Sequence, residues 1–322
     1  MFKHYVKVAI RQIKRSFLFS SINMLGFVLG MTAAFLIYLW IVDELTFEDF
    51  NKNGDYIYRV IREEQSAKGQ VPSTVTPLSE VFRKDFSKVE NATFIKYGGK
   101  YDIYAGDVGV EANYGYVDTT FFDVFSFPVV AGDPSLLKKD PQMVVLSEAI
   151  AEKLFGKTSA IGKEVTCKFN KKYYKVAAVL KVPRKSHIQF EVLASWDSYL
   201  WDEIKDELWG FSERMHVFIQ LKKGTSLTDA DRLAMRDIWV KHSQWGKPLA
   251  FQPLKDIHLR TAFKEPNDVY NHGNMQQIYL FAALAALIIF MGAFNFMTLS
   301  TARASLRSKE IGVRKVNGAK RK

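Results

Sequence analysis

Two long stretches of the chain contain no charged residue, and a mixed pattern of polar and apolar residues lies between them. The first stretch, Phe17 to Val42, is 26 residues long and would measure about 39 Å as a helix. The second runs from Met275 to Ala302, and its apolar part begins at Ile278. Because the core of a bilayer is about 30 Å thick, we predict transmembrane helices at 17–42 and 278–302.

Two other interpretations of these stretches are weaker. A core helix of a soluble protein rarely continues for so many residues without one charge. A cleaved signal peptide has a shorter apolar region and a cleavage site of small residues after it, and no such site follows Val42. We therefore expect an uncleaved membrane anchor at the first stretch.

Basic residues gather at the two ends of the chain. Of the 45 basic residues, five precede the first span and eight follow the second, whereas Glu310 is the one acidic residue in these two flanks. The part between the spans is close to neutral. This asymmetry follows the positive-inside rule, so it predicts both ends in the cytoplasm and residues 43–277 outside it. Nucleic-acid binding would require the basic residues on a folded domain, and we expect none.

The first sixteen residues have a helical pattern of their own. Apolar side chains, among them Phe2, Val6 and Ile13, fall on one side of a helix, and the lysines and Arg11 fall on the other. This pattern predicts a basic amphipathic helix at 1–16 that lies on the inner membrane surface and contacts membrane lipids. An ordinary basic flank is the alternative.

The pattern between the spans is mixed α and β. The fold class predicted from it is α+β, with two transmembrane helices flanking an extracytoplasmic α/β domain at 43–277, divided into two subdomains near 183–196. The lone cysteine, Cys167, is expected to be a core or strand residue. The elements expected within the domain are strands at 142–146 and 215–221, a hairpin at 163–169 and 173–180, a helix from Ser147 to Gly156 and a helix over 228–241.

One segment matches a phosphate-binding pattern only superficially. Ala151 to Thr158 reads A-x-x-x-x-G-K-T, but a phosphate-binding loop must follow a strand and begin a helix. Here strong helix formers precede Gly156, so the glycine is expected to end a helix. The six histidines and the cysteine form no metal-ligand motif. We expect no enzyme active site, no cofactor and no metal.

The two spans carry polar or small residues that matter in a membrane. Gly26 and Gly30 form G-x-x-x-G in the first span, a spacing that lets another helix approach closely. Asn295 places an amide in the second span, where it requires a hydrogen-bond partner on a neighbouring helix. These three residues are the predicted packing positions.

The end of the chain resembles a known family. Asn295 to Arg321 (NFMTLSTARASLRSKEIGVRKVNGAKR) is similar to the cytoplasmic end of permeases of the FtsX/MacB type, the membrane subunits of one class of bacterial ABC transporter. Ser21 to Val60 resembles their first span. Further phrases resemble their periplasmic core domain, namely Val117 to Pro134, Gln142 to Gly156, Lys185 to Ser195 and Leu254 to Thr261.

The resemblance implies a non-catalytic permease subunit of the bacterial inner membrane. A separate ABC ATPase subunit would hydrolyse ATP, and the permease would transmit its motion to the periplasmic domain for export or efflux. The resemblance also implies a second permease copy or homologue, forming a dimer, and a periplasmic adaptor as further partners. The segment that would dock on the ATPase is 303–322, with Arg307, Lys309, Glu310, Gly312, Arg314, Lys315, Gly318 and Ala319 as candidate residues.

The sequence departs from the family in one respect, and one alternative to the permease interpretation remains. Permeases of this family continue into two more spans, whereas this sequence stops at Lys322, so we expect the N-terminal portion of a permease. The alternative is a two-span sensor or scaffold whose outer domain binds a partner and never couples to ATP. The segment from Glu310 to Ala319 favours the permease, because a simple anchor does not need it.

Overall fold

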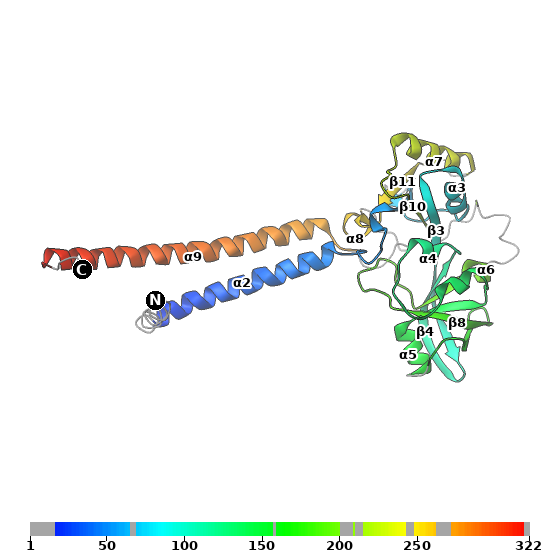
Figure 1. Cartoon of the computed structure of the whole chain (residues 1–322), viewed down its shortest axis with the longest axis horizontal. Helices are drawn as coiled ribbons and strands as arrows, with labels where there is room; N and C mark the ends of the chain where they lie inside the picture. The colour runs from blue at the N-terminus through cyan, green and yellow to red at the C-terminus, as the bar shows by residue number, and fades with distance from the viewer. Residues whose placement is uncertain are drawn as a thin grey trace. The chain divides into compact units, whose positions relative to one another are not determined.

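The computed structural model describes residues 17–64, 69–156, 159–199, 209, 215–242, 248–261 and 272–318. Two compact units make up the chain (Figure 1). The first unit consists of the chain's two ends, Met1–Leu45 and Asn274–Lys322, and the second is Thr46–Gly273. The expected amphipathic helix at 1–16 lies outside the described residues.

The first unit is a pair of long helices that pack side by side, α2 (Phe17–Leu45) and α9 (Met275–Val316) (Figure 1). Met24–Leu45 and Met275–Thr298 are long and apolar enough to cross a membrane, and only 6% and 0% of these two segments is buried. A core helix of a soluble protein would be mostly buried, so the exposed surface agrees with the predicted spans. Trp40 meets Phe281 edge to face at 5.0 Å between ring centroids.

The described residues of the second unit form one mixed eleven-stranded sheet, in which nine strands follow the order β11-β1-β10-β3-β4-β9-β6-β8-β5. Strand β2 pairs with β1, and β7 pairs with β3 and β8. Most pairs are antiparallel, while β4–β9 and β6–β8 are parallel. The strands are β1 (Ile57–Glu64), β2 (Gly69–Val71), β3 (Val89–Ala105), β4 (Val108–Val117), β5 (Val129–Gly132), β6 (Met143–Ser147), β7 (Glu164–Cys167), β8 (Lys172–Leu180), β9 (Val192–Ser195), β10 (Met215–Leu221) and β11 (Leu249–Pro253).

Strands β6 and β10 are buried on both faces of the sheet, which explains why their sequences are mainly apolar, with His216 and Gln220 as the polar residues of β10. Successive residues of a strand point to opposite faces. In β10, Val217 and Ile219 belong to one hydrophobic cluster and Phe218 to the other. The helices that cover the two faces are α3 (Pro77–Asp85), α5 (Glu148–Phe155) and α7 (Asp229–His242) on the first cluster, and α4 (Phe121–Val124) and α8 (Asp256–Arg260) on the second.

Several local elements agree with the sequence patterns. The predicted hairpin is β7 and β8, which pair from Glu164↔Lys175 to Cys167↔Lys172, and Cys167 is a buried strand residue. The remaining short helices are α6 (Trp196–Tyr199) and the 3₁₀ turns η1 (Gly54–Tyr56) and η2 (Pro134–Lys138). The mixed α and β fold with two flanking apolar helices is therefore confirmed.

The segment that imitates a phosphate-binding loop ends a helix, as its composition suggested. The Ser147 hydroxyl caps α5 by accepting from the Ile150 amide at 3.3 Å. Gly156 follows α5 with a φ of +61°, a left-handed conformation that favours glycine. Lys157 and Thr158 lie outside the described residues. The order is strand, helix, glycine, which is the reverse of the order that cradles a phosphate.

Candidate functional site: the junction between membrane helices and domain

The chain enters the domain through a short segment that is fixed by a buried carboxylate. This entering segment, Thr46 to Asn53, follows α2 and leads through η1 into β1. Glu48 is 1% exposed and adopts a φ of +64°, a left-handed conformation that is uncommon for residues other than glycine. Such backbone strain persists only where surrounding contacts hold it.

The Glu48 carboxylate supplies those contacts. Its Oε1 atom accepts hydrogen bonds from the backbone amide of His187 and from Nδ1 of the His187 ring, the latter at 2.7 Å. Its Oε2 atom accepts from the Asn51 side-chain amide at 2.7 Å. The Glu48 amide donates to the Lys185 carbonyl at 2.9 Å.

His187 itself is part of the core. It is 1% exposed, and its ring meets Phe125 and Phe218 at 6.4 and 5.5 Å between centroids. Asn51 continues the connection, since its Oδ1 accepts from the Ser126 amide at 3.0 Å. Any movement of Glu48 relative to the domain therefore requires breaking several buried hydrogen bonds at once, and such bonds are costly to leave unmade.

Helix α8 contacts both chain connections. On the entering side, the Phe47 ring stacks on the buried His258 ring, with 3.5 Å between centroids and 5° between planes. On the leaving side, the Gly273 amide donates to the His258 carbonyl at 2.8 Å. His272 contacts the Ile257 carbonyl at 3.3 Å through Nδ1. One five-residue helix is thus held by the residues that precede α9 and by those that follow α2.

An ion-pair network adds a surface component to the same junction. Lys255 Nζ lies 2.9 Å from an Asp55 carboxylate oxygen and 3.1 Å from one of Asp49. The Asp55 and Asp49 carboxylates raise the pKa of Lys255 above its ordinary value. All three side chains are well exposed, so each pair contributes little to stability. The two ion pairs join the entering segment and η1 to the residue that precedes α8.

The first and last strands of the domain are hydrogen-bonded neighbours. β1 pairs with β11 from Tyr58↔Pro253 to Arg62↔Leu249. Arg59, which is fully buried, reaches across this pair and donates from Nη2 to Gln252 Oε1 at 2.8 Å. Both connections to the membrane helices therefore lead into adjacent strands at one side of the sheet.

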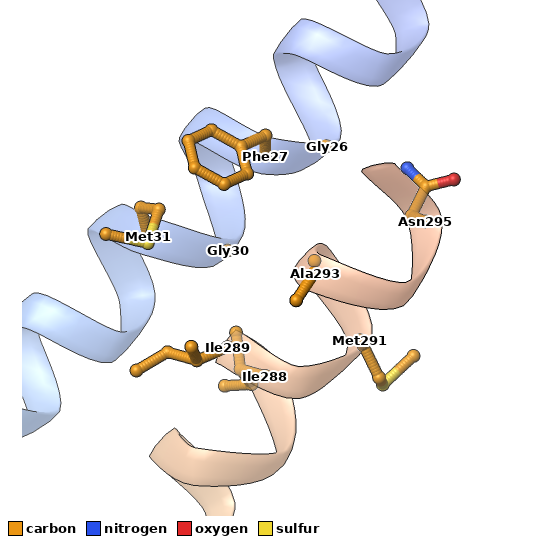
Figure 2. A pocket seen from close by; sticks show the side chains of 10 residues that line it. Gly26, Phe27, Gly30, Met31, Ile288, Ile289, Met291, Ala293 and Asn295 are labelled. Carbon is orange, nitrogen blue, oxygen red and sulfur yellow. The ribbon is translucent and has the colours of Figure 1, made fainter. Parts of the chain in front are cut away.

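The predicted packing residues of the spans line one cavity. The cavity lies between α2 and α9 and has a volume of about 720 Å³. Gly26, Gly30 and Asn295 are among its lining residues (Figure 2). A Cβ on Gly30 would lie 3.4 Å from Ile288, whereas a Cβ on Gly26 would meet nothing within 4 Å. Gly30 is thus where the two helices come close. Asn295 makes no hydrogen bond to any residue that the structure describes, and its expected interhelical partner stays a prediction.

The predicted coupling residues lie along the end of α9, which continues unbroken from the span to Val316. This part of the chain is one long helix and not a separate short one, and no proline interrupts its sequence. The candidate residues within it are Arg307, Lys309, Glu310, Gly312, Arg314 and Lys315. Gly312 has open space around it, and Gly318 follows the helix with a φ of +82°. Ala319 lies outside the described residues. The docking role of this segment stays a prediction.

Comparison with known proteins places the chain in a family. The family model described as MacB-like periplasmic core domain matches residues 20–235. The chain belongs to this family. That membership places it among permease proteins of ABC transporters.

Individual relatives of this MacB-like chain are distant. The macrolide export ATP-binding/permease protein MacB of Neisseria gonorrhoeae is 24% identical over 208 residues, which cover 64% of this chain and 30% of that protein. MacB 1 of Yersinia pestis is 25% identical over 230 residues, covering 69% and 33%. The chain thus spans about a third of the length of the curated relatives it matches.

A solved structure supports the fold of the MacB-like domain. A crystal structure of a domain assigned to a permease protein of Porphyromonas gingivalis superposes with a TM-score of 0.54 at 16% identity. The match covers 72% of this chain and 99% of that domain. At this identity the likeness concerns the fold alone.

Sequence reasoning missed the junction. Glu48 and His187 are separated by 139 positions, and no local pattern links them. The resemblance of Ser21–Val60 and Lys185–Ser195 to family segments marks both partners, but it does not show that they meet. The one available signal is an acidic residue shortly after a predicted span, and it does not point to a histidine.

Proposed function

We propose that this chain is the part of an ABC permease that transmits movement between membrane helices and a periplasmic domain. A partner ATPase subunit would hydrolyse ATP, and the MacB-like domain would move in response, driving export or efflux. The observation that supports this proposal is how the chain connects α2 and α9 to the domain. Both membrane helices lead into adjacent strands, and α8 contacts both connections.

The stiffness of the entering segment supports the transmission of motion. A loop of flexible residues between a helix and a domain would absorb motion, because each of its backbone torsions can rotate independently. The entering segment is instead held by a buried carboxylate with three hydrogen bonds and by a stacked ring. In this proposal, a displacement that reaches Thr46 is passed on to β1, because the entering segment does not absorb it.

The proposed setting is the inner membrane, with the Thr46–Gly273 unit on the periplasmic side. The basic flanks support this orientation through the positive-inside rule. A second copy of the permease or a homologue, the membrane lipids and a periplasmic adaptor are the further partners in this proposal. The cytoplasmic end of α9 would meet the ATPase.

The orientation can be tested by thiol labelling in intact spheroplasts. We expect Ser226→Cys to react with a membrane-impermeant reagent and Ser308→Cys to remain unlabelled. Both positions are exposed, so accessibility depends on the side of the membrane. Asn113→Cys is a less suitable probe, because Asn113 is hydrogen-bonded to Glu191. The unsubstituted chain is the control, since Cys167 is buried. Equal labelling at 226 and 308 would contradict the orientation.

The transmission itself can be tested by loosening α8. In a complete permease assembled with its ATPase, Phe47→Ala should remove the ring stacked on His258 and leave the rest of the junction in place. We expect the nucleotide-dependent change in spectrum of a spin label at Ser226 to fall by at least about half, because the connection becomes compliant. ATPase binding should be retained.

A matched control is Phe169→Ala, which removes an aromatic ring stacked on Tyr101 at 4.3 Å in another part of the domain. This variant should leave the label response unchanged. If Phe47→Ala and Phe169→Ala behave alike, α8 does not transmit motion. If nucleotide does not change the spectrum of the spin label in the unsubstituted permease or in either variant, the chain is a two-span scaffold that is not coupled to ATP.

A further inference from the structure

A second cavity lies inside the Thr46–Gly273 unit, away from the junction. It has a volume of about 330 Å³ and is bordered by α3 and by the residues that follow β4 and β9. These two strands are parallel neighbours, paired from Tyr114↔Val192 to Val117↔Ser195, so their carboxyl ends meet at one edge. Such an edge is a common place for small ligands in sheets with helices on both faces.

Two carboxylates at this edge, Asp118 and Asp197, form no ion pair with any residue that the structure describes. Asp118 follows β4, and its oxygens accept from the Thr93 hydroxyl and from the Thr120 amide and hydroxyl. Burial raises the pKa of Asp118 to about 6, against the opposing effects of these hydrogen bonds and of the positive charge of Arg83. Asp197, in α6, is exposed, and its carboxylate has no ion pair with a residue in the described ranges.

The remaining charges of the lining are one acid and one base. Glu80 is already paired with Lys84 at 2.5 Å. Arg83 lies on the same helix, and no ion pair joins it to the described part of the chain. With Asp118 ionised, the unpaired charges therefore comprise two carboxylates and one guanidinium, which leaves the cavity with an excess of negative charge. A cationic group is the ligand that this charge favours.

The cavity also has an apolar wall. Phe94 and Trp196 are 5% and 6% exposed, and they meet edge to face with 5.6 Å between centroids. Pro77 and Ala92 extend this surface. An aromatic wall beside carboxylates suits a ligand with a charged amine and an apolar body, because aromatic rings attract cations and bury apolar area.

A buried hydroxyl in the lining is without a partner. Thr76 is 5% exposed and precedes α3, yet its side chain does not cap that helix. Its Oγ1 atom has no hydrogen-bond partner among the residues described. Buried hydroxyls are rarely left in this condition, and an ammonium group would supply the missing donor.

We propose that this cavity binds a small organic ammonium ion, with its amine between Asp118 and Asp197 and its apolar body against Phe94 and Trp196. The amine would come from a simple amine or from an amino acid, whose carboxylate would then meet Arg83. The proposal rests on the cavity alone and is independent of the proposed transport function.

The test uses the full chain in detergent and measures binding by titration calorimetry. The probes are 2-phenylethylamine, the anion 3-phenylpropionate of similar size, and phenylalanine. We expect 2-phenylethylamine to bind once per chain with a Kd of about a millimolar or tighter, as its few heavy atoms allow. 3-Phenylpropionate should not bind. Binding of the amine should weaken as the pH falls below about 6, because Asp118 then becomes protonated.

Substitutions identify the site. Asp118→Asn and Asp197→Asn should each weaken amine binding by at least about tenfold. Asp107→Asn, in the exposed turn between β3 and β4, is the matched control and should bind like the unsubstituted chain. Asp197 is exposed, so Asp197→Asn keeps the test valid if Asp118→Asn fails to fold.

The remaining outcomes are decisive. Stronger binding of phenylalanine that is lost in Arg83→Gln would support the site and show that the ligand is an amino acid. Equal binding of 3-phenylpropionate and the amine would overturn the proposal. Unchanged amine binding in both Asp118→Asn and Asp197→Asn would overturn it as well.

Discussion

Glu48→Ala is expected to lower the free energy of unfolding of the domain by about 3–5 kcal/mol. Removing one partner of a buried ionic or hydrogen-bonded pair leaves the other without a partner, and the cost is typically of this size. Here the His187 ring, the His187 amide and the Asn51 amide would all lose their acceptor. The measurement is denaturant unfolding of the full chain in detergent, followed by tryptophan fluorescence.

Two further variants show whether the loss belongs to this pair. Glu111→Ala removes an exposed carboxylate that lies 3.8 Å from Lys100, and it should change stability by no more than about 0.5 kcal/mol. The double variant Glu48→Ala with His187→Ala should be less destabilised than the sum of the single variants, because residues in contact couple. Strict additivity would mean that the two side chains do not act as a pair.

Gly312→Leu is expected to weaken association of a complete permease with its ATPase by at least about tenfold. The space around Gly312 is open, since an added Cβ meets nothing within 4 Å, so leucine can be accommodated without disturbing α9. Any loss of association must then arise at the surface of α9 that contacts the ATPase. Arg314→Glu should act in the same direction by reversing a charge, and charge pairs at interfaces can carry a few kcal/mol.

Co-purification of the ATPase and stimulated ATP hydrolysis are the measurements for this prediction. Gly312→Ala and Arg314→Lys are the matched controls, because the first adds little volume and the second keeps the charge. Membrane insertion should survive all four changes, since enough positive charge remains in both flanks. If Gly312→Leu and Arg314→Glu both retain the ATPase, the end of α9 serves as a topology signal only.

Local patterns predicted those parts of the molecule whose physics is local. The two apolar helices follow from the absence of charge over a bilayer's thickness, and α5 follows from a capping serine and a terminal glycine. The hairpin of β7 and β8 follows from two strand-forming runs separated by a short turn. In each case the determining residues lie within a few positions of one another.

The order of the strands and the junction could not be predicted in this way. β1 lies between β10 and β11, and the choice of these neighbours depends on which buried surfaces match across the whole domain. The Glu48–His187 contact likewise depends on the tertiary fold, because neither residue has a local signal of its role. In the sequence, His187 belongs to no metal-ligand motif, and no local pattern relates it to an acid 139 positions away.

The pairing of β1 with β11 has a consequence for how such proteins change over evolutionary time. Adjacent strands in a sheet are separated by about 4.8 Å, so the two ends of the folded unit emerge close together. A unit with neighbouring ends can be exchanged as a cassette, because a host polypeptide needs only a small gap to accept it. Lineages could thus replace or elaborate this module while keeping an inherited pair of long apolar helices.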